Sequence, residues 1–186
     1  MNIHIETGVA PDAGIIEFLE GKLMAHNREK IPGYAYENAI LTVRDEADGD
    51  PAAGLHGQIG GGWFYVASLW VRKGCRGQGI GKGLLTCAEE LARKKNCTGA
   101  YLYTYSFQNP GFYERLGYEI FGTLPHFCGD GAKYYMKKML IKEEGMPVRL
   151  PEQLYCLFEC QPSEKRRLVK VRPGHVHLGP GQPVGV

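Results

Sequence analysis

The feature that most constrains the fold is a glycine-rich turn placed between an apolar segment and an amphipathic one. Residues 63–71, WFYVASLWV, are mostly apolar, aromatic or β-branched, which predicts a central strand covered on both faces. Residues 73–83, KGCRGQGIGKG, follow almost directly. Beyond Gly79, apolar residues recur at the spacing of an amphipathic helix; they are Ile80, Leu84, Ala88 and Leu91. A strand, a turn and a helix in this order favour a layered α/β fold.

The glycine turn, residues 73–83, is suited to holding an anion. Backbone N–H groups and the positive end of the following helix can bind a phosphate, and glycine lets the backbone approach it closely. The Walker motif does not fit, because Arg76 stands where it needs glycine and Gly83 where it needs Ser or Thr. The dinucleotide fingerprint fails as well, because Lys82 or Leu84 stands at its third glycine. An ordinary turn before an ordinary helix remains the alternative.

Charged residues indicate the exposed face of this helix. Glu89 with Arg93 and Glu90 with Lys94 are spaced i,i+4 in the favourable order, and we expect both pairs to point outward. Over the whole chain, 22 Lys and Arg against 20 Asp and Glu give a formal net charge of +2. This balance predicts no nucleic-acid partner.

The remaining sequence predicts further strands and helices around this unit. Asp12 stands at the start of a helical pattern. Asn109 is expected to cap a short helix that begins at Pro110 and whose end is marked by Gly117. Further strands are expected at residues 3–6, 39–44, 52–61, 100–105, 118–122 and 132–141.

The composition changes near the carboxyl end, which predicts two parts. Residues 1–142 form the expected main domain, and residues 143–186 form an extension with a hairpin or arm before a loose Gly- and Pro-rich end. The hairpin could pair with the sheet edge of a second copy, so a homodimer is one expectation. His175 and His177 are too few ligands for a metal site, and none is predicted.

Targeting signals and cysteine spacing bear on the compartment. The first residues lack the layout of a signal peptide, and no apolar run reaches the length of a membrane helix, so we expect a cytoplasmic protein without a membrane partner. The six cysteines lack zinc-binding spacing and are expected to be reduced thiols, mostly buried.

Two motifs together resemble the GNAT superfamily of N-acetyltransferases. Arg76, Gly79 and Gly81 follow the pattern Arg-x-x-Gly-x-Gly, which resembles the family signature Q/R-x-x-G-x-G/A that holds the pyrophosphate of acetyl-CoA. Residues 107–122, FQNPGFYERLGYEIFG, resemble the later family motif in which a short helix carries a tyrosine before E-x-L-G-F/Y. The strong resemblance covers residues 66–122, and a weaker one extends from the amino terminus to about residue 140.

The resemblance implies a GNAT fold with acetyl-CoA as cosubstrate and no metal. The sheet is expected to be mixed and mostly antiparallel, with helices on both faces and a splay between two central parallel strands. These strands map to residues 63–71 and 100–105, and the pantetheine arm would lie between them. The implied cofactor-binding residues are Leu69, Trp70, Val71, Arg76, Gly77, Gln78, Gly79, Ile80, Gly81, Lys82 and Asn109.

Catalysis by such an enzyme needs a neutral amine, a donor to the oxyanion and an acid for the thiolate. The resemblance makes Tyr113 the general acid, whereas the residues alone favour a packing tyrosine beside Phe112 and Leu116. Relatives place a carboxylate near the central strand, but residues 63–71 contain none. Glu37, His56 or a water chain are the candidates for the base. Cys75 is interpreted as incidental, because family members transfer the acyl group directly.

The expected reaction is acetyl transfer to a primary amine of a small molecule. Acetylation of a protein amino terminus or lysine is an alternative that needs an open groove. The missing strand carboxylate also makes a non-catalytic acetyl-CoA-binding module conceivable. Residues 62–70 with Tyr34 and Tyr36 either line the acceptor pocket or belong to the core.

Overall fold

The structure is a computed structural model that describes residues 12–45 and 49–141. These residues form two compact units. The first contains the described residues 12–35, and the second contains the described residues 36–45 and 49–141. The strand expected at residues 3–6 and the extension expected at residues 143–186 lie outside the described residues.

The first unit is the helix α1, Ala13–Lys30, where the sequence predicts a helix. The Asp12 carboxylate caps it by accepting hydrogen bonds from the N–H groups of Gly14 and Ile15, at 2.9 and 3.1 Å. None of its side chains is buried. None of the described helices is long and apolar enough to cross a membrane.

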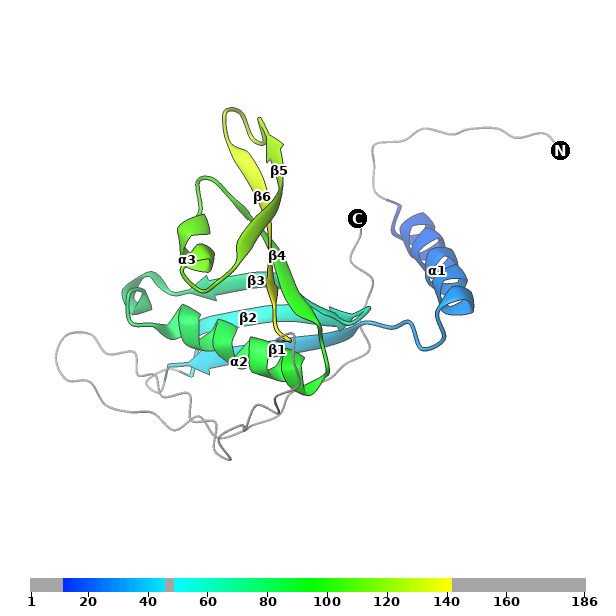
Figure 1. Cartoon of the computed structure of the whole chain (residues 1–186), viewed down its shortest axis with the longest axis horizontal. Coiled ribbons are helices and arrows are strands. Elements are labelled where there is room, and N and C mark those ends of the chain that lie inside the picture. The colour runs from blue at the N-terminus through cyan, green and yellow to red at the C-terminus, as the bar shows by residue number, and fades with distance from the viewer. Residues whose placement is uncertain (1–11, 46–48, 142–186) are drawn as a thin grey trace. The chain divides into compact units, whose positions relative to one another are not determined.

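The second unit is built on a six-stranded sheet in the order β1-β2-β3-β4-β6-β5 (Figure 1). All neighbouring strands are antiparallel except β3 and β4, which are parallel. The strands are β1 Glu37–Arg44, β2 Pro51–Gly60, β3 Trp63–Val71, β4 Gly99–Tyr105, β5 Glu119–Pro125 and β6 Ala132–Met139. This confirms the mixed, mostly antiparallel sheet with residues 63–71 as a central strand. Cover by helices on both faces stays a prediction.

The two parallel strands separate partway along their length. Their pairing ends at Val66 and Leu102, although β3 continues to Val71 and β4 to Tyr105. The antiparallel pairing of β3 with β2 shifts at the same place, because Ala67 is an extra residue there. A bulge bends its strand and increases the local twist. The splay expected between the central strands is therefore present, and it begins at the bulge.

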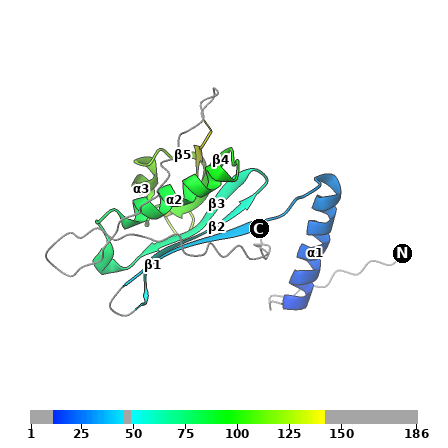
Figure 2. The ribbon, with the colours of Figure 1, turned by 90° about the horizontal axis from the view of Figure 1, so that it is seen from below.

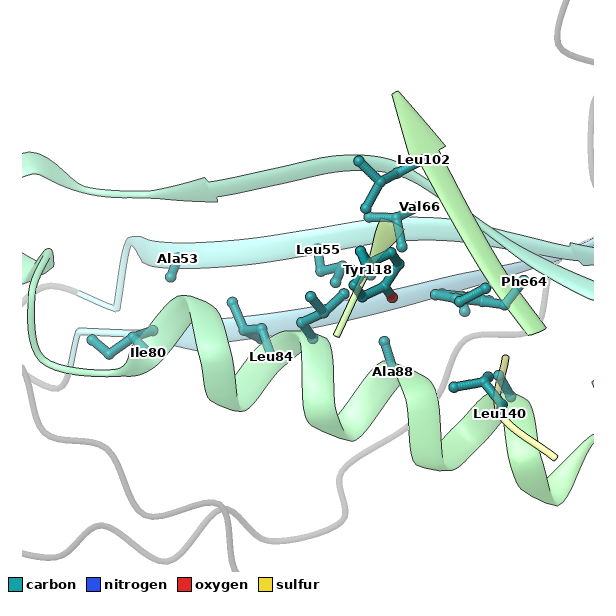
Figure 3. Close-up of a cluster of buried hydrophobic side chains, with 14 of the residues drawn as sticks. Ala53, Leu55, Phe64, Val66, Ile80, Leu84, Ala88, Leu102, Tyr118 and Leu140 are labelled. Atoms are coloured by element: carbon teal, nitrogen blue, oxygen red, sulfur yellow. The ribbon is translucent and has the colours of Figure 1, made fainter. Parts of the chain in front are cut away.

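The core lies between the sheet and the helix α2, Ile80–Lys94, which crosses one face over β1, β2 and β3 (Figure 2). The buried stripe of α2 includes Ile80, Leu84 and Ala88, as its spacing predicts. The side chains facing it come from several strands, and Tyr118 lies among them (Figure 3); they include Ala53, Leu55, Phe64, Val66, Leu102 and Leu140.

The expectation that Glu89 points outward is wrong. Its side chain is only 5% exposed, and its Oε2 lies 2.7 Å from Lys138 Nζ and 3.5 Å from Arg93 Nη2. Glu89 follows Leu85 by four residues, so it continues the buried stripe of α2. A lysine from the far strand β6 compensates its charge, and the sequence spacing within the helix gives no sign of that partner.

Two expectations about side chains also need correction. The short helix α3, Pro110–Glu114, does follow Asn109, but the Asn109 side chain makes no capping hydrogen bond. Cys97 and Cys128 are free, whereas Cys75 and Cys87 each take part in a disulfide bond, so the expected reduced thiols are wrong at these two positions. The absence of zinc-binding spacing excludes a common metal site but does not exclude cysteine pairing.

Candidate active site

The glycine turn connects the end of β3 to the start of α2 through a short 3-10 helix, Lys73–Cys75. The Cys75 N–H donates to the carbonyl of Arg72 at 2.9 Å. Gly77 and Gly79 then adopt positive φ angles of 76° and 83°. L-residues with a side chain rarely adopt this conformation, so these two glycines are required by the backbone. The turn therefore has a defined shape that the sequence specifies locally.

The backbone N–H groups of the turn point to an anion-binding function. Those of residues 77–82 have no acceptor among the described residues, and the first N–H that is bonded again is Gly83, which donates to Gly79 at 2.9 Å. These groups surround the amino terminus of α2, where the helix dipole favours negative charge. Six consecutive N–H donors at a helix start, without an acceptor in the described part of the chain, are suited to a diphosphate.

The side chains of the turn differ in what they can offer. The Arg76 Nε donates to the carbonyl of Val71 at 2.9 Å, which fixes the guanidinium against the end of β3 and leaves its terminal nitrogens available. Gln78 Nε2 donates to the carbonyl of Gly74 at 3.2 Å. The Lys82 side chain is exposed, whereas that of Ile80 is buried in the core and offers a ligand only its backbone.

The end of β3 supplies an unpaired backbone edge. Beyond Val66 the edge that faces β4 has no strand partner among the described residues. The Val71 carbonyl on this edge accepts from Arg76 Nε, and the other outward N–H and C=O groups could pair with a ligand. Leu69 and Val71 pack against the core, and Trp70 is 51% exposed on the other face. The structure thus places the predicted residues 69–71 along the opened side of the splay.

Tyr113 lies on α3, close to the glycine turn. A side-chain carbon added at Gly81 would lie 3.5 Å from the Phe112 ring, so the start of α2 and α3 are in contact. The Tyr113 ring packs edge-on against Phe112 and Tyr118 at 5.0 and 6.0 Å between centroids. Burial raises the pKa of Tyr113, which keeps its hydroxyl protonated at neutral pH. Asn109, one residue before α3, is exposed.

The two candidate bases both have side-chain partners but lie at different places relative to the splay. Glu37 accepts hydrogen bonds from Lys95 Nζ at 2.8 and 3.0 Å, just beyond the carboxyl end of α2 and away from the glycine turn. His56 Nε2 lies 3.3 Å from Asn38 Oδ1 and its Cα pairs with Ser68 next to the β3 bulge. Glu37 is therefore remote from the splay, while His56 is near it.

A large aromatic surface on β3, β4 and β6 was predicted only in part, because Tyr65 alone of its rings lies in residues 62–70, which were expected to line the acceptor pocket or the core. Tyr65, Tyr101, Tyr103 and Tyr135 form a continuous series of ring contacts, and Lys133 lies over the Tyr103 ring. The alternation of tyrosines in residues 101–105 could have indicated one face of a strand. Nothing in the sequence places Lys133 above it.

Comparisons with known proteins agree with this geometry. The Acetyltransferase (GNAT) family matches residues 16–118. The chain belongs to the GNAT family. An acetyltransferase of Agrobacterium fabrum is 36% identical over 128 residues, which cover 68% of this chain and 93% of that protein. The blasticidin-S acetyltransferase of Streptomyces morookaense is 41% identical over 80 residues, but the match spans only 42% of this chain and 59% of that protein.

The solved structures support the same conclusion about the GNAT chain. The crystal structure of an acetyltransferase from Bacillus cereus is 26% identical and has a TM-score of 0.66, covering 74% of this chain and 97% of that one. As a member of the GNAT family, this protein is an acetyl-CoA-dependent acyltransferase. Among its described residues, no group of three or more His, Cys, Asp or Glu is arranged to hold a metal ion.

Proposed function

We propose that this GNAT protein transfers an acetyl group from acetyl-CoA directly to a primary amine of a small molecule. The observation that carries the proposal is the row of N–H groups from Gly77 to Lys82 at the start of α2, none of which has an acceptor within residues 12–45 and 49–141. The cosubstrate supplies an activated thioester and a diphosphate. The backbone of the glycine turn would bind that diphosphate, with Arg76 and Lys82 adding positive charge.

The unpaired edge of β3 would hold the pantetheine arm and the thioester. Residues 69–71 lie on the stretch of β3 beyond its last pair with β4, where an amide-bearing chain could pair with the outward backbone groups as a strand would. A backbone N–H at this edge would also donate to the oxyanion that develops when the amine attacks the carbonyl carbon.

Tyr113 is the proposed general acid. The amine nitrogen forms the new C–N bond, the C–S bond breaks, and the Tyr113 hydroxyl would give its proton to the departing thiolate. Its raised pKa keeps that proton in place before the reaction. The attacking amine must lose a proton, and His56 is better placed than Glu37, which is bound to Lys95. If water carries this proton from the amine to His56, the reaction does not need a carboxylate on the central strand.

Relatives named for antibiotic substrates support a small-molecule acceptor. The chain is 41% identical over 80 residues to the blasticidin-S acetyltransferase, whose name gives a small molecule as its acceptor. A small amine needs only a cleft beside the splay, whereas a peptide needs a longer groove.

The test is release of free thiol from acetyl-CoA by the purified protein. The panel contains aminoglycosides, streptothricin-like antibiotics, blasticidin S, polyamines, amino acids and short peptides, with a no-acceptor control. Release that depends on a small amine is the expected result. Acetylation of peptides alone would overturn the small-molecule assignment. Binding of acetyl-CoA without turnover on any acceptor would support a non-catalytic module instead.

A further inference from the structure

The face of the sheet that turns away from α2 is lined by tyrosines. On β4, Leu102 and Thr104 are buried toward the core, so the alternating Tyr101, Tyr103 and Tyr105 project to the opposite face. The Tyr65 ring stacks on Tyr101 at 5.0 Å and lies 6.4 Å from Tyr103. This tyrosine face therefore connects β3 and β4 across the point where they begin to separate.

Lys133 of β6 is held over this face by aromatic rings. Its Nζ lies 3.8 Å from the centroid of Tyr103, 5.1 Å from that of Tyr135 and 5.5 Å from that of Phe127. All three distances are within the range of cation–π attraction. The lysine is half-buried and Tyr103 is 37% exposed, so the ammonium group is fixed beside a surface that a ligand can reach.

Within the described ranges, Lys133 has no carboxylate partner, whereas two of its neighbours on β6 do. Lys137 lies 3.3 Å from Glu119, and Lys138 lies 2.7 Å from Glu89. In the part of the chain that the structure describes, no Asp or Glu lies within ion-pair distance of Lys133. Aromatic rings orient a cation but do not neutralise it, so Lys133 keeps a full positive charge that can attract an anion.

The Lys133 ammonium lies close to the place where the proposed reaction would occur. Tyr103 directly follows Leu102, the last residue of β4 that pairs with β3, so the ring under Lys133 stands at the start of the splay. The thioester would lie in that opening, because the unpaired edge of β3 faces it. A molecule with its amine at the thioester could place another group on the tyrosine face.

We propose that Lys133 and the tyrosine face form an acceptor subsite for an acidic amine, in which the Lys133 ammonium binds a carboxylate and Tyr103 with Tyr65 packs against a flat part of the acceptor. The subsite rests on the proposed acetyltransferase function. Flat rings pack well on tyrosine, and a fixed, half-buried ammonium pairs better with a carboxylate than an exposed one does. A purely cationic acceptor would be repelled by Lys133 and would gain nothing from this subsite.

Two probes isolate the effect of the acidic group. 4-(Aminomethyl)benzoate and 4-(aminomethyl)benzamide carry the same ring and the same primary amine, and only the benzoate has a negative charge. We would measure their dissociation constants by titration calorimetry in the presence of coenzyme A. The proteins are the wild type, Lys133→Met, Lys133→Arg and Lys137→Met, which serves as the matched control on the same strand and face.

The wild type should bind the benzoate about tenfold more tightly than the benzamide, as expected for one charged contact. Lys133→Met should abolish this preference without weakening benzamide binding, and Lys133→Arg should retain most of it. Lys137→Met should keep the full preference. Equal binding of the two probes to the wild type, no measurable binding of either, or a preference that survives in Lys133→Met would overturn the proposal.

Acetyl-CoA binding and thiol release on the same preparations separate this inference from the proposed function. If acetyl-CoA binds and amines are acetylated but the benzoate preference is absent, the subsite is wrong and the acetyltransferase stands. If the wild type binds no acetyl-CoA, the proposed acetyltransferase function is itself refuted, whatever the two probes show. Thermal unfolding of Lys133→Met checks that the β4 and β6 pairing survives, because a role confined to stability would lower the melting temperature without changing the preference.

Discussion

Replacing Gly77 by alanine tests whether the shape of the glycine turn matters for cofactor binding. Gly77 has a φ of 76°, and a side-chain carbon added there would meet nothing within 4 Å. The substitution therefore adds backbone strain without a steric clash. Holding a residue with a side chain in the left-handed region costs about 1 to 2 kcal/mol. This strain must appear either in the stability of the free protein or in the binding of acetyl-CoA.

The two outcomes can be measured on one protein. If the free turn relaxes to negative φ, binding must restore the strained form, and the dissociation constant of acetyl-CoA rises about 5- to 30-fold. If the turn is held rigidly, affinity is unchanged and the free energy of unfolding falls by the same 1 to 2 kcal/mol. Titration calorimetry gives the first quantity, and urea denaturation followed by circular dichroism gives the second.

Gly81→Ala is the matched control, four residues along the same turn. Its backbone is helical, and an added carbon would be 3.5 Å from Phe112, an ordinary van der Waals distance. Alanine favours the helix over glycine by about 1 kcal/mol, so this variant should be as stable as the wild type or more so, with unchanged affinity. A Gly77→Ala protein that matches the wild type in both stability and affinity would refute the assigned geometry.

Three further substitutions, one of them with a matched control, address the site and the core. Arg76→Glu places a negative charge at the end of β3, which repels the diphosphate of acetyl-CoA. The affinity for acetyl-CoA should fall about tenfold at low salt and by less at high salt. Calorimetry at two ionic strengths measures this. Tyr113→Phe should lower kcat by about 10² to 10⁴ and leave acetyl-CoA affinity unchanged. Because burial raises the pKa of Tyr113 and its protonated form is the acid, the alkaline fall in wild-type kcat due to this group should begin above the ordinary tyrosine range, and Tyr113→Phe should lack it. Lys138→Met removes one of two cations beside the buried Glu89 and should reduce the free energy of unfolding by about 1 to 3 kcal/mol. Lys137→Met breaks an exposed pair with Glu119 and a distant contact with the Phe121 ring, and it should cost less than about 1 kcal/mol.

Local sequence patterns were sufficient to predict the elements that hold the turn. The β3 run is bounded by Gly62 and Arg72, and its observed range, Trp63–Val71, equals the predicted one. The start of α2 at Ile80 follows from the glycines and the apolar spacing. The splay also agrees with the resemblance, although the sequence does not show that Ala67 is the bulged residue.

Contacts between distant residues could not be predicted in the same way. Glu37 and Lys95 are 58 positions apart, and the pair forms only because β1 lies under the end of α2. Lys133 reaches Tyr103 through the register of β4 and β6, in which Tyr105 pairs with Lys133 and Tyr103 with Tyr135. Strand register depends on the whole sheet, so a single segment does not reveal which side chains of another strand it will meet.

The buried charges near Tyr118 connect the stability of the core to the position of the proposed acid. Tyr118 is 3% exposed, and its pKa is raised by burial and then by Glu89. The same ring packs against Tyr113, and Glu89 is held by Lys138 of β6. Weakening the Glu89 contact would therefore loosen the support behind Tyr113 as well as the core. Lys138→Met should then lower kcat more than it raises the dissociation constant of acetyl-CoA, because the glycine turn lies at the other end of α2. Equal losses in both would indicate general loosening of the fold.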